Sequence, residues 1–124
     1  MQPKLVLVVD DDEAVRAMLA KALQAKGYQV EVAGDGLAAS EILGKLGQLP
    51  DLLICDVMMP TIDGFSLARL LKSRAELRAI PLIFVTARAA PHDVLDGINL
   101  GARHYVQKPF NLKELIQKVD KLLR

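Results

Sequence analysis

The chain has 124 residues, which is enough for one compact domain and too few for two domains with separate cores. We therefore expect a single domain over residues 1–124. Hydrophobic residues make up 52% of the chain and charged residues 25%, a composition that excludes a disordered chain. The net charge of +1 provides no strong positive field, so direct binding to nucleic acid or to an anionic membrane surface is not expected.

The single cysteine and the two ends of the chain bear on where the protein works. Cys55 lies inside an apolar run and has no second cysteine to pair with, so we interpret it as a core residue. Residues Met1–Lys4 precede a short apolar run that soon becomes acidic, which does not fit a signal peptide. No apolar stretch approaches the ~20 residues that span a bilayer. We expect a cytoplasmic protein with no membrane partner and no linker after Leu122–Arg124.

Five short segments have the pattern of β-strands. Three are continuous apolar runs, typical of strands covered on both faces: Leu5–Val9, Leu52–Cys55 and Leu82–Val85. Tyr28–Val32 alternates apolar and polar residues, and His104–Val106 is short. These last two are predicted to lie at the edges of a sheet.

Between the strands, apolar residues recur at helical spacing. Gly27 and Gly101 are placed to end helices, Asp11 or Asp12 to cap the first helix, and Asn111 to cap the last. The helical patterns run through Val15, Met18, Leu19, Ala22 and Leu23; Ala38, Ile42, Leu43 and Leu46; Phe65, Ala68, Leu71 and Lys72; Val94, Leu95 and Ile98; and Leu112, Leu115, Ile116, Val119, Leu122 and Leu123.

Strands alternating with helices predict the α/β fold class: a single doubly wound (βα)5 domain with a parallel five-stranded sheet and right-handed crossovers. With the second and fifth strands at the edges, the strand order 2-1-3-4-5 of flavodoxin-like folds fits the pattern. Its switch point lies between the first and third strands. Asp10, Asp11 and Asp56 would meet there.

Polar side chains follow four of the predicted strands. Asp10–Asp12 come after the first, Asp56 after the third, Thr86 after the fourth and Lys108 after the fifth. Because parallel strands end at the same edge of a sheet, these groups would share one pocket. Asp10–Asp12 alone would indicate only an acidic helix start. As a set, the carboxylates, hydroxyl and ammonium suit a divalent cation with oxygen ligands and a phosphoryl group.

Five motifs carry a family resemblance. They are Val8–Glu13, Asp56–Phe65, Val85–Arg88, Gly101–Ala102 and Lys108–Phe110. In this order and at this spacing they resemble a response-regulator receiver domain of the chemotaxis-regulator type, the phosphoacceptor module of two-component signalling. The resemblance covers the chain from Lys4 to Leu123.

The resemblance implies that Asp56 accepts a phosphoryl group with the help of Mg²⁺. A cation is needed because the reaction brings two anions together. Asp11 and Asp56 would bind the metal directly, Asp10 mainly through water, and Met58 through its backbone carbonyl. Mg²⁺ is suited to such a set of few protein oxygens and several waters.

Lys108 would place its ammonium against a phosphoryl oxygen, and a cis peptide between Lys108 and Pro109 would aim it. Thr86 would hydrogen-bond another phosphoryl oxygen. By the same resemblance, this draws the Thr86 loop inward and lets Tyr105 turn from an exposed to a buried rotamer. A local charge would thus bias a two-state element.

Met58 and Arg88 would flank the water that hydrolyses the acyl phosphate. Neither side chain can act as a base. Met58 has no strong hydrogen-bonding group to orient a water, and Arg88 is long enough to cover the phosphoryl group. The sequence therefore predicts slow self-dephosphorylation.

The resemblance also implies the partners. A sensor histidine kinase or a phosphotransfer protein would donate the phosphoryl group. A downstream protein or output domain would be reached through the surface of the fourth helix, fifth strand and fifth helix, and a phosphorylation-dependent dimer is one form this output can take. On this interpretation the protein is not an enzyme in the usual sense, because it catalyses only its own phosphorylation and dephosphorylation.

Two other interpretations stay open. A haloacid-dehalogenase-like phosphatase would use Asp10 and Asp12, but this leaves Asp56 unexplained, and the only acids after Lys108 lie within a helix pattern. A pseudo-receiver would be an unphosphorylated binding module on the same fold, although the intact set of site residues speaks against it.

His92 and His104 lack a second ligand at metal spacing and are interpreted as surface residues. Along the chain, the predicted site residues end with Lys108 and its neighbour Pro109.

Overall fold

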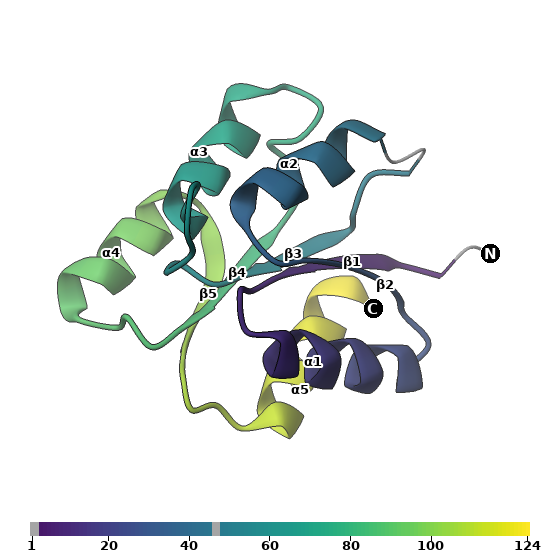
Figure 1. The fold of residues 1–124 in the computed structure, drawn as a ribbon. Helices are drawn as coiled ribbons and strands as arrows, with labels where there is room; N and C mark the ends of the chain where they lie inside the picture. The colour runs from purple at the N-terminus through teal and green to yellow at the C-terminus, as the bar shows by residue number, and fades with distance from the viewer. Residues whose placement is uncertain (1–2, 46–47) are drawn as a thin grey trace.

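A computed structural model describes residues 3–45 and 48–124. The described residues form five strands that alternate with five helices (Figure 1). The strands are β1 (Leu5–Val9), β2 (Gln29–Ala33), β3 (Leu52–Cys55), β4 (Leu82–Thr86) and β5 (Ala102–Gln107). The helices are α1 (Glu13–Ala25), α2 (Gly36–Lys45), α3 (Gly64–Ser73), α4 (Pro91–Asn99) and α5 (Leu112–Leu123). Leu46, which we predicted to lie in the second helix, is outside the described residues, as are Met1 and Gln2.

The strands form one parallel sheet in the order β2-β1-β3-β4-β5. This confirms the doubly wound, flavodoxin-like fold with the order 2-1-3-4-5. The three strands with continuous apolar runs, β1, β3 and β4, occupy the centre, and every one of their residues is buried. The sequence pattern placed them there because only a strand covered on both faces is apolar at every position.

Helices cover both faces of the sheet. Figure 1 shows α1 and α5 together on one face and α2, α3 and α4 on the other. Alternate residues of β1 point to opposite faces, so that Val6 and Val8 pack with α1 and α5 while Leu7 and Val9 pack with α2 and α3. Cys55 is buried in the second of these cores, as its apolar surroundings predicted.

The edge strands differ from the prediction in their bounds. β5 is longer than His104–Val106 because it pairs along the whole of β4. The register shifts between Leu82 and Ile83, whose partners are Ala102 and His104, so Arg103 is an extra residue of the kind that forms a β-bulge. β2 begins one residue late because Tyr28 instead closes α1, with its backbone N–H donating to Leu23 O at 3.2 Å.

Local signals set the helix ends. The Asp12 side chain caps α1 by accepting hydrogen bonds from the N–H groups of Ala14 and Val15, and Asn111 caps α5 in the same way. Gly27 follows α1 with a φ of 93°, a left-handed conformation that favours glycine. No helix in the described part of the chain is long and apolar enough to cross a membrane.

The start of α3 lies against the end of β3. A Cβ atom on Gly64 would come within 2.2 Å of the Asp56 carbonyl oxygen and 2.9 Å of Val57 Cα, and the Gly64 N–H donates to the Val57 carbonyl at 3.0 Å. Both neighbouring groups are backbone, so they cannot rotate away. Glycine at this position therefore permits the loop after Asp56 to fold back tightly.

We predict that Gly64→Ala destabilises the protein by about 1–3 kcal/mol, because the added methyl group forces the backbone apart. Urea unfolding followed by circular dichroism measures this change. Gly44→Ala is the matched control, since a Cβ atom there meets nothing within 4 Å and alanine favours a helix. Equal stability of Gly64→Ala and wild type would show that the loop after Asp56 does not need this close approach.

Candidate functional site

Three carboxylates gather at the carboxyl edge of the sheet. Asp10 and Asp11 follow β1 and Asp56 follows β3, and one oxygen from each lies within 4.8 Å of the others. The pairing of β1 with β3 sets this arrangement, because the Asp56 N–H donates to the Val9 carbonyl at 2.9 Å. Asp10 and Asp56 are 2% and 5% exposed, whereas Asp11 is exposed to solvent. The structure brings together the acids that the topology predicted.

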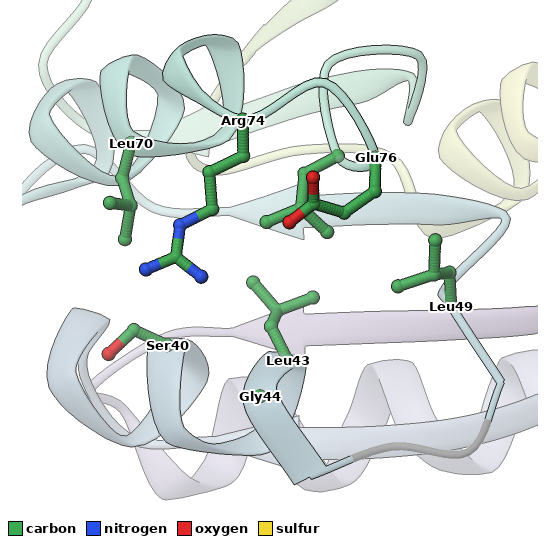
Figure 2. A pocket seen from close by; sticks show the side chains of 8 residues that line it. Ser40, Leu43, Gly44, Leu49, Leu70, Arg74 and Glu76 are labelled. Carbon is green, nitrogen blue, oxygen red and sulfur yellow. The ribbon is translucent and has the colours of Figure 1, made fainter.

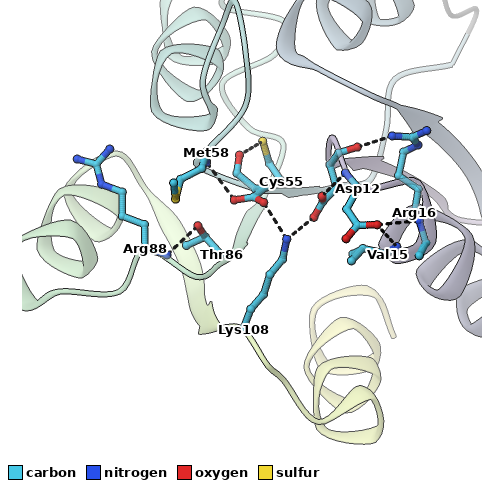
Figure 3. Close-up of polar contacts among 11 residues, drawn as sticks. Asp12, Val15, Arg16, Cys55, Met58, Thr86, Arg88 and Lys108 are labelled. Carbon is cyan, nitrogen blue, oxygen red and sulfur yellow. Dashed lines mark hydrogen bonds and ion pairs between the residues drawn. The ribbon is translucent and has the colours of Figure 1, made fainter.

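Lys108 bridges the two buried carboxylates. Its Nζ atom lies 2.8 Å from Asp10 Oδ2 and 2.8 Å from Asp56 Oδ2 (Figure 3). The lysine is held in place by the Lys108 N–H, which donates to the Thr86 carbonyl at 2.9 Å, and the Lys108–Pro109 peptide is cis. The ammonium group of the residue that follows β5 thus offsets part of the negative charge of the carboxylates that follow β1 and β3.

The two buried carboxylates are oriented in the same way. In each, one oxygen accepts a hydrogen bond from the Lys108 ammonium, and the other accepts one from the backbone N–H two residues further along the chain. Asp10 Oδ1 accepts from the Asp12 N–H at 2.9 Å, and Asp56 Oδ1 accepts from the Met58 N–H at 3.0 Å. These hydrogen bonds fix both planes, so the position of each oxygen is defined by the backbone.

Burial and pairing shift the pKa values of Asp10 and Lys108. Desolvation raises the pKa of Asp10 above its ordinary value of 3.8, and the hydrogen bonds from Lys108 and the Asp12 N–H offset only part of that rise. For Lys108, desolvation favours a lower pKa, but the hydrogen bonds and charges of Asp10 and Asp56 outweigh it and raise the pKa above 10.5. The lysine is therefore held as a cation.

The oxygen cluster fits a hard divalent cation. Among the described residues, the group that could hold a metal ion is Asp10, Asp11 and Asp56. Carboxylate oxygens with an open, solvent-facing side match the few protein ligands and several waters that Mg²⁺ prefers. Met58, the predicted carbonyl ligand, follows Asp56 in the same loop, and its side chain is exposed.

The predicted switch residues meet at the backbone of Arg88. Thr86 is fully buried, and its Oγ1 accepts a hydrogen bond from the Arg88 N–H at 3.1 Å. The half-buried Tyr105 donates its hydroxyl hydrogen to the Arg88 carbonyl. The Tyr105 ring lies against Gly97 of α4 and against Phe84, whose ring centre is 5.9 Å away.

The side chains predicted to flank the acyl phosphate line one open hollow. Met58 and Arg88 border it together with Asp11, and the hollow has a volume of about 430 Å³. The Arg88 Nε–H donates to Asp93 Oδ1 at 2.7 Å, so the guanidinium is held at the rim by α4. Sequence reasoning missed Asp93, whose only signal was an acid in the first turn of a helix.

The two histidines and a second hollow lie outside the cluster of Asp10, Asp11 and Asp56. His92 is largely exposed, as predicted, with its Nε2 atom 3.3 Å from Asp93, and His104 is half-buried on β5. Figure 2 shows a second hollow, of about 350 Å³, between α2 and α3. Leu43, Leu70 and Arg74 line it, and it includes none of the predicted site residues.

A sequence model of the family described as "Response regulator receiver domain" matches residues 6–120. The chain belongs to this family. Receiver domains are signalling modules of two-component systems and not enzymes in the usual sense. Residues from three of the motifs that carry the resemblance lie together in the structure, because Asp10, Asp11 and Asp56 form the acidic cluster and Lys108 pairs with two of them.

Curated relatives agree with the family. The chain is 41% identical over 119 residues to "Response regulator MprA" of Mycobacterium leprae, which covers 96% of this chain and 50% of the relative. It is 42% identical over 119 residues to the protein of the same name from Mycobacterium ulcerans, with the same coverage. The receiver domain described here thus spans about half the length of the curated relatives it matches.

Solved structures show the same fold. A putative response regulator from Chloroflexus aurantiacus superposes with a TM-score of 0.89 at 36% identity, covering 98% of each chain. The chemotaxis protein CheY4 of Vibrio cholerae superposes with a TM-score of 0.88 at 31% identity, covering 98% of this chain and 99% of that one.

The phosphatase interpretation loses its support. It requires Asp10 and Asp12 to act together, but the Asp12 carboxylate is occupied by the cap of α1 and is not part of the acidic cluster. The third acid of the cluster is Asp56, which that interpretation leaves unexplained. The family match points to the receiver domain instead.

We predict that Asp10→Asn stabilises the metal-free protein at neutral pH. Because the pKa of Asp10 is raised in the folded state, keeping its charge buried costs stability above that pKa. As the pH falls through the raised pKa, the folded wild type takes up the proton, and the difference from the variant shrinks until it levels off below 3.8. Urea unfolding of both proteins in a chelator, from pH 7 to pH 3.5, measures the difference.

Mg²⁺ provides the control for this experiment. A cation bound by the acidic cluster should stabilise wild type more than Asp10→Asn, and so reduce or reverse the difference seen in the chelator. A wild type that is more stable than Asp10→Asn at pH 7 without metal would contradict the predicted cost of the buried charge.

Proposed function

We propose that this receiver domain accepts a phosphoryl group on Asp56 in the cytoplasm, from the phosphohistidine of a sensor histidine kinase or of a phosphotransfer protein. The observation that carries the proposal is the setting of the Asp56 carboxylate. It is held by a backbone N–H, lies 2.8 Å from the Lys108 ammonium, and shares a cluster with Asp10 and Asp11. The receiver family to which the chain belongs supports it as well.

The transfer needs little from the protein besides position and charge. An Asp56 oxygen would attack phosphorus as the bond from phosphorus to the histidine nitrogen breaks, and the histidine side chain would leave. Lys108 would follow the new phosphoryl group and pair with one of its oxygens. Asp10, Asp11, Asp56 and the Met58 carbonyl would hold Mg²⁺. When bound, the Mg²⁺ supplies the positive charge that lets two anions approach each other.

The output of this reaction is proposed to run through Thr86 and Tyr105. Thr86 Oγ1 now accepts from the Arg88 N–H, and its hydroxyl hydrogen is available to a phosphoryl oxygen. Movement of this loop would change the Tyr105 hydroxyl contact, which is made to the Arg88 carbonyl. The resulting change in the α4-β5-α5 surface would alter binding to a downstream protein or output domain, or form a dimer.

Met58 and Arg88 are proposed to set how long the signal lasts. Both border the open hollow beside Asp11 through which water would reach phosphorus. Neither can accept a proton from that water, which favours a long-lived phosphorylated form. The protein would thus catalyse only its own phosphorylation and slow dephosphorylation. A pseudo-receiver, by contrast, would take no phosphoryl group at all.

We expect one added phosphoryl group, on Asp56, when the protein is incubated with Mg²⁺ and a small acyl-phosphate donor. Intact-mass measurement detects the addition. Asp56→Asn should abolish it, and a chelator should suppress it, because the acceptor and the metal are both required. Asp51→Asn is a matched control, since Asp51 is an acid at the other end of β3 that accepts a hydrogen bond from the Leu5 N–H.

The same experiment separates the receiver from the pseudo-receiver. Wild type that remains unlabelled under conditions that label another receiver domain would favour the pseudo-receiver. Labelling of Asp56→Asn to the wild-type level would show that another residue is the acceptor.

We predict that Thr86→Ala takes up the phosphoryl group but loses most of the structural response around Tyr105. The alanine removes the hydroxyl that links the phosphoryl group to the loop and leaves Asp56 and Lys108 in place. Two-dimensional NMR with beryllofluoride, a phosphoryl mimic, follows the amide signals of α4 and β5. Shifts in the variant as large as those of wild type would disprove the coupling through Thr86.

A further inference from the structure

The two oxygens of the Asp93 carboxylate accept hydrogen bonds from two different residues. Its Oδ1 atom accepts the Arg88 Nε–H at 2.7 Å, while its Oδ2 atom accepts the Ala90 N–H at 3.2 Å at the start of α4. The Asp93 side chain is 4% exposed and the Arg88 side chain 45%. One oxygen therefore caps the helix, and the other holds a largely exposed cation.

Arg88 is held at the edge of the proposed phosphoryl site without entering it. Its side chain lines the hollow next to Asp11 and Met58, and its guanidinium carbon lies 5.8 Å from the centre of the Phe65 ring. Figure 3 shows the guanidinium pointing away from Lys108. Backbone hydrogen bonds to Thr86 and Tyr105 fix the residue itself, so rotation of the side chain alone can redirect the charge.

A phosphoryl group on Asp56 would compete with Asp93 for this cation. A phosphoryl group carries more negative charge than a carboxylate and offers three acceptor oxygens, and a guanidinium can bind two of them at once. Asp93 would not be left unpaired, because Oδ2 keeps the Ala90 N–H and His92 Nε2 lies 3.3 Å from Oδ1.

The contact between Arg88 and Asp93 opposes this competition. Burial favours a higher pKa for Asp93, but the hydrogen bond and charge of Arg88, with a smaller contribution from His92, outweigh it and lower the pKa below 3.8. Asp93 is therefore charged at neutral pH, and any anion that attracts Arg88 must first overcome this pairing.

We propose that Asp93 is a positioning residue that holds Arg88 away from the phosphoryl site, and that phosphorylated Asp56 takes Arg88 over from Asp93. This inference rests on the proposed phosphorylation of Asp56. The exchange breaks the side-chain link between the loop after β4 and the first turn of α4, but leaves the Ala90 cap of that helix intact. Occupation of the phosphoryl site would thus be transmitted directly to α4.

The exchange also bears on the lifetime of the acyl phosphate. In hydrolysis, a water oxygen forms a bond to phosphorus and the bond from phosphorus to the Asp56 oxygen breaks. Asp56 is left as a carboxylate, and the protons of the water go to the released inorganic phosphate or to solvent. A guanidinium transferred to the phosphoryl oxygens would cover the open side from which this water comes. Asp93 would shorten the signal by competing for Arg88.

The test is a double-mutant cycle with beryllofluoride and Mg²⁺ as the probe, read by isothermal titration calorimetry. Asp93→Asn should bind the probe about 3- to 10-fold more tightly than wild type, because Arg88 is released in advance. Arg88→Met should bind it more weakly, and Asp93→Asn should then have no further effect in the Arg88→Met background. A purely structural role of Asp93 would change the affinity equally in both backgrounds.

Several controls make the cycle decisive. Asparagine can still accept the Ala90 N–H, and Asp93→Ser provides a second variant with a capping oxygen should Asp93→Asn fold poorly. His92→Gln removes the imidazole beside Asp93 and should leave the affinity for the probe within about twofold of wild type. In wild type, the NMR signal of the Arg88 Nε–H should shift when the probe binds.

The outcomes distinguish this inference from the proposed function. Wild-type protein that binds no beryllofluoride and takes up no phosphoryl group would overturn both. If wild type binds the probe but Asp93→Asn has the same affinity, or the Arg88 Nε–H signal does not move, the exchange of Arg88 is overturned and the phosphorylation of Asp56 stands.

Discussion

The ammonium of Lys108 between two buried carboxylates is the interaction on which the site depends. Asp10 and Asp56 come from neighbouring strands, and a parallel sheet places both at one edge with little water around them. Two such charges repel each other strongly in a buried setting. A single cation at 2.8 Å from each makes the arrangement tolerable, yet leaves Asp11 facing solvent. The buried charges are thus partly balanced, and the cluster keeps three carboxylates that could hold a metal ion.

The parts of this structure that follow from hydrophobic pattern were predictable. Leu5–Val9 and Leu52–Cys55 are apolar at every position, which is typical of central strands, and their bounds were predicted to the residue. Once they are parallel neighbours, the meeting of Asp10 and Asp56 is a matter of topology. The strand order was predicted from flavodoxin-like folds. The patterns of the second and fifth strands place both at the edges of the sheet but do not fix the order of the strands between them.

Contacts between particular side chains, and the local register of β5, could not be predicted from the sequence. The Arg88–Asp93 contact requires a particular loop path between β4 and α4, and the sequence contains no pattern for that path. The hydrogen bond from the Tyr28 hydroxyl to Asp120 joins residues far apart in the chain. The extra residue at Arg103 shifts the register of β5, and an alternation pattern cannot reveal such a shift in so short a strand.

The contacts of Thr86 and Tyr105 with Arg88 are made to its amide and its carbonyl, not to its side chain. Almost any amino acid provides those two groups, and proline alone would lack the donor. The identity of residue 88 can therefore vary in evolution without disturbing the link between β4 and β5. The link through Thr86 and Tyr105 could then be kept in copies of this domain in which residue 88 differs, whereas the contact with Asp93 would be kept only where residue 88 carries a side chain that can pair with a carboxylate.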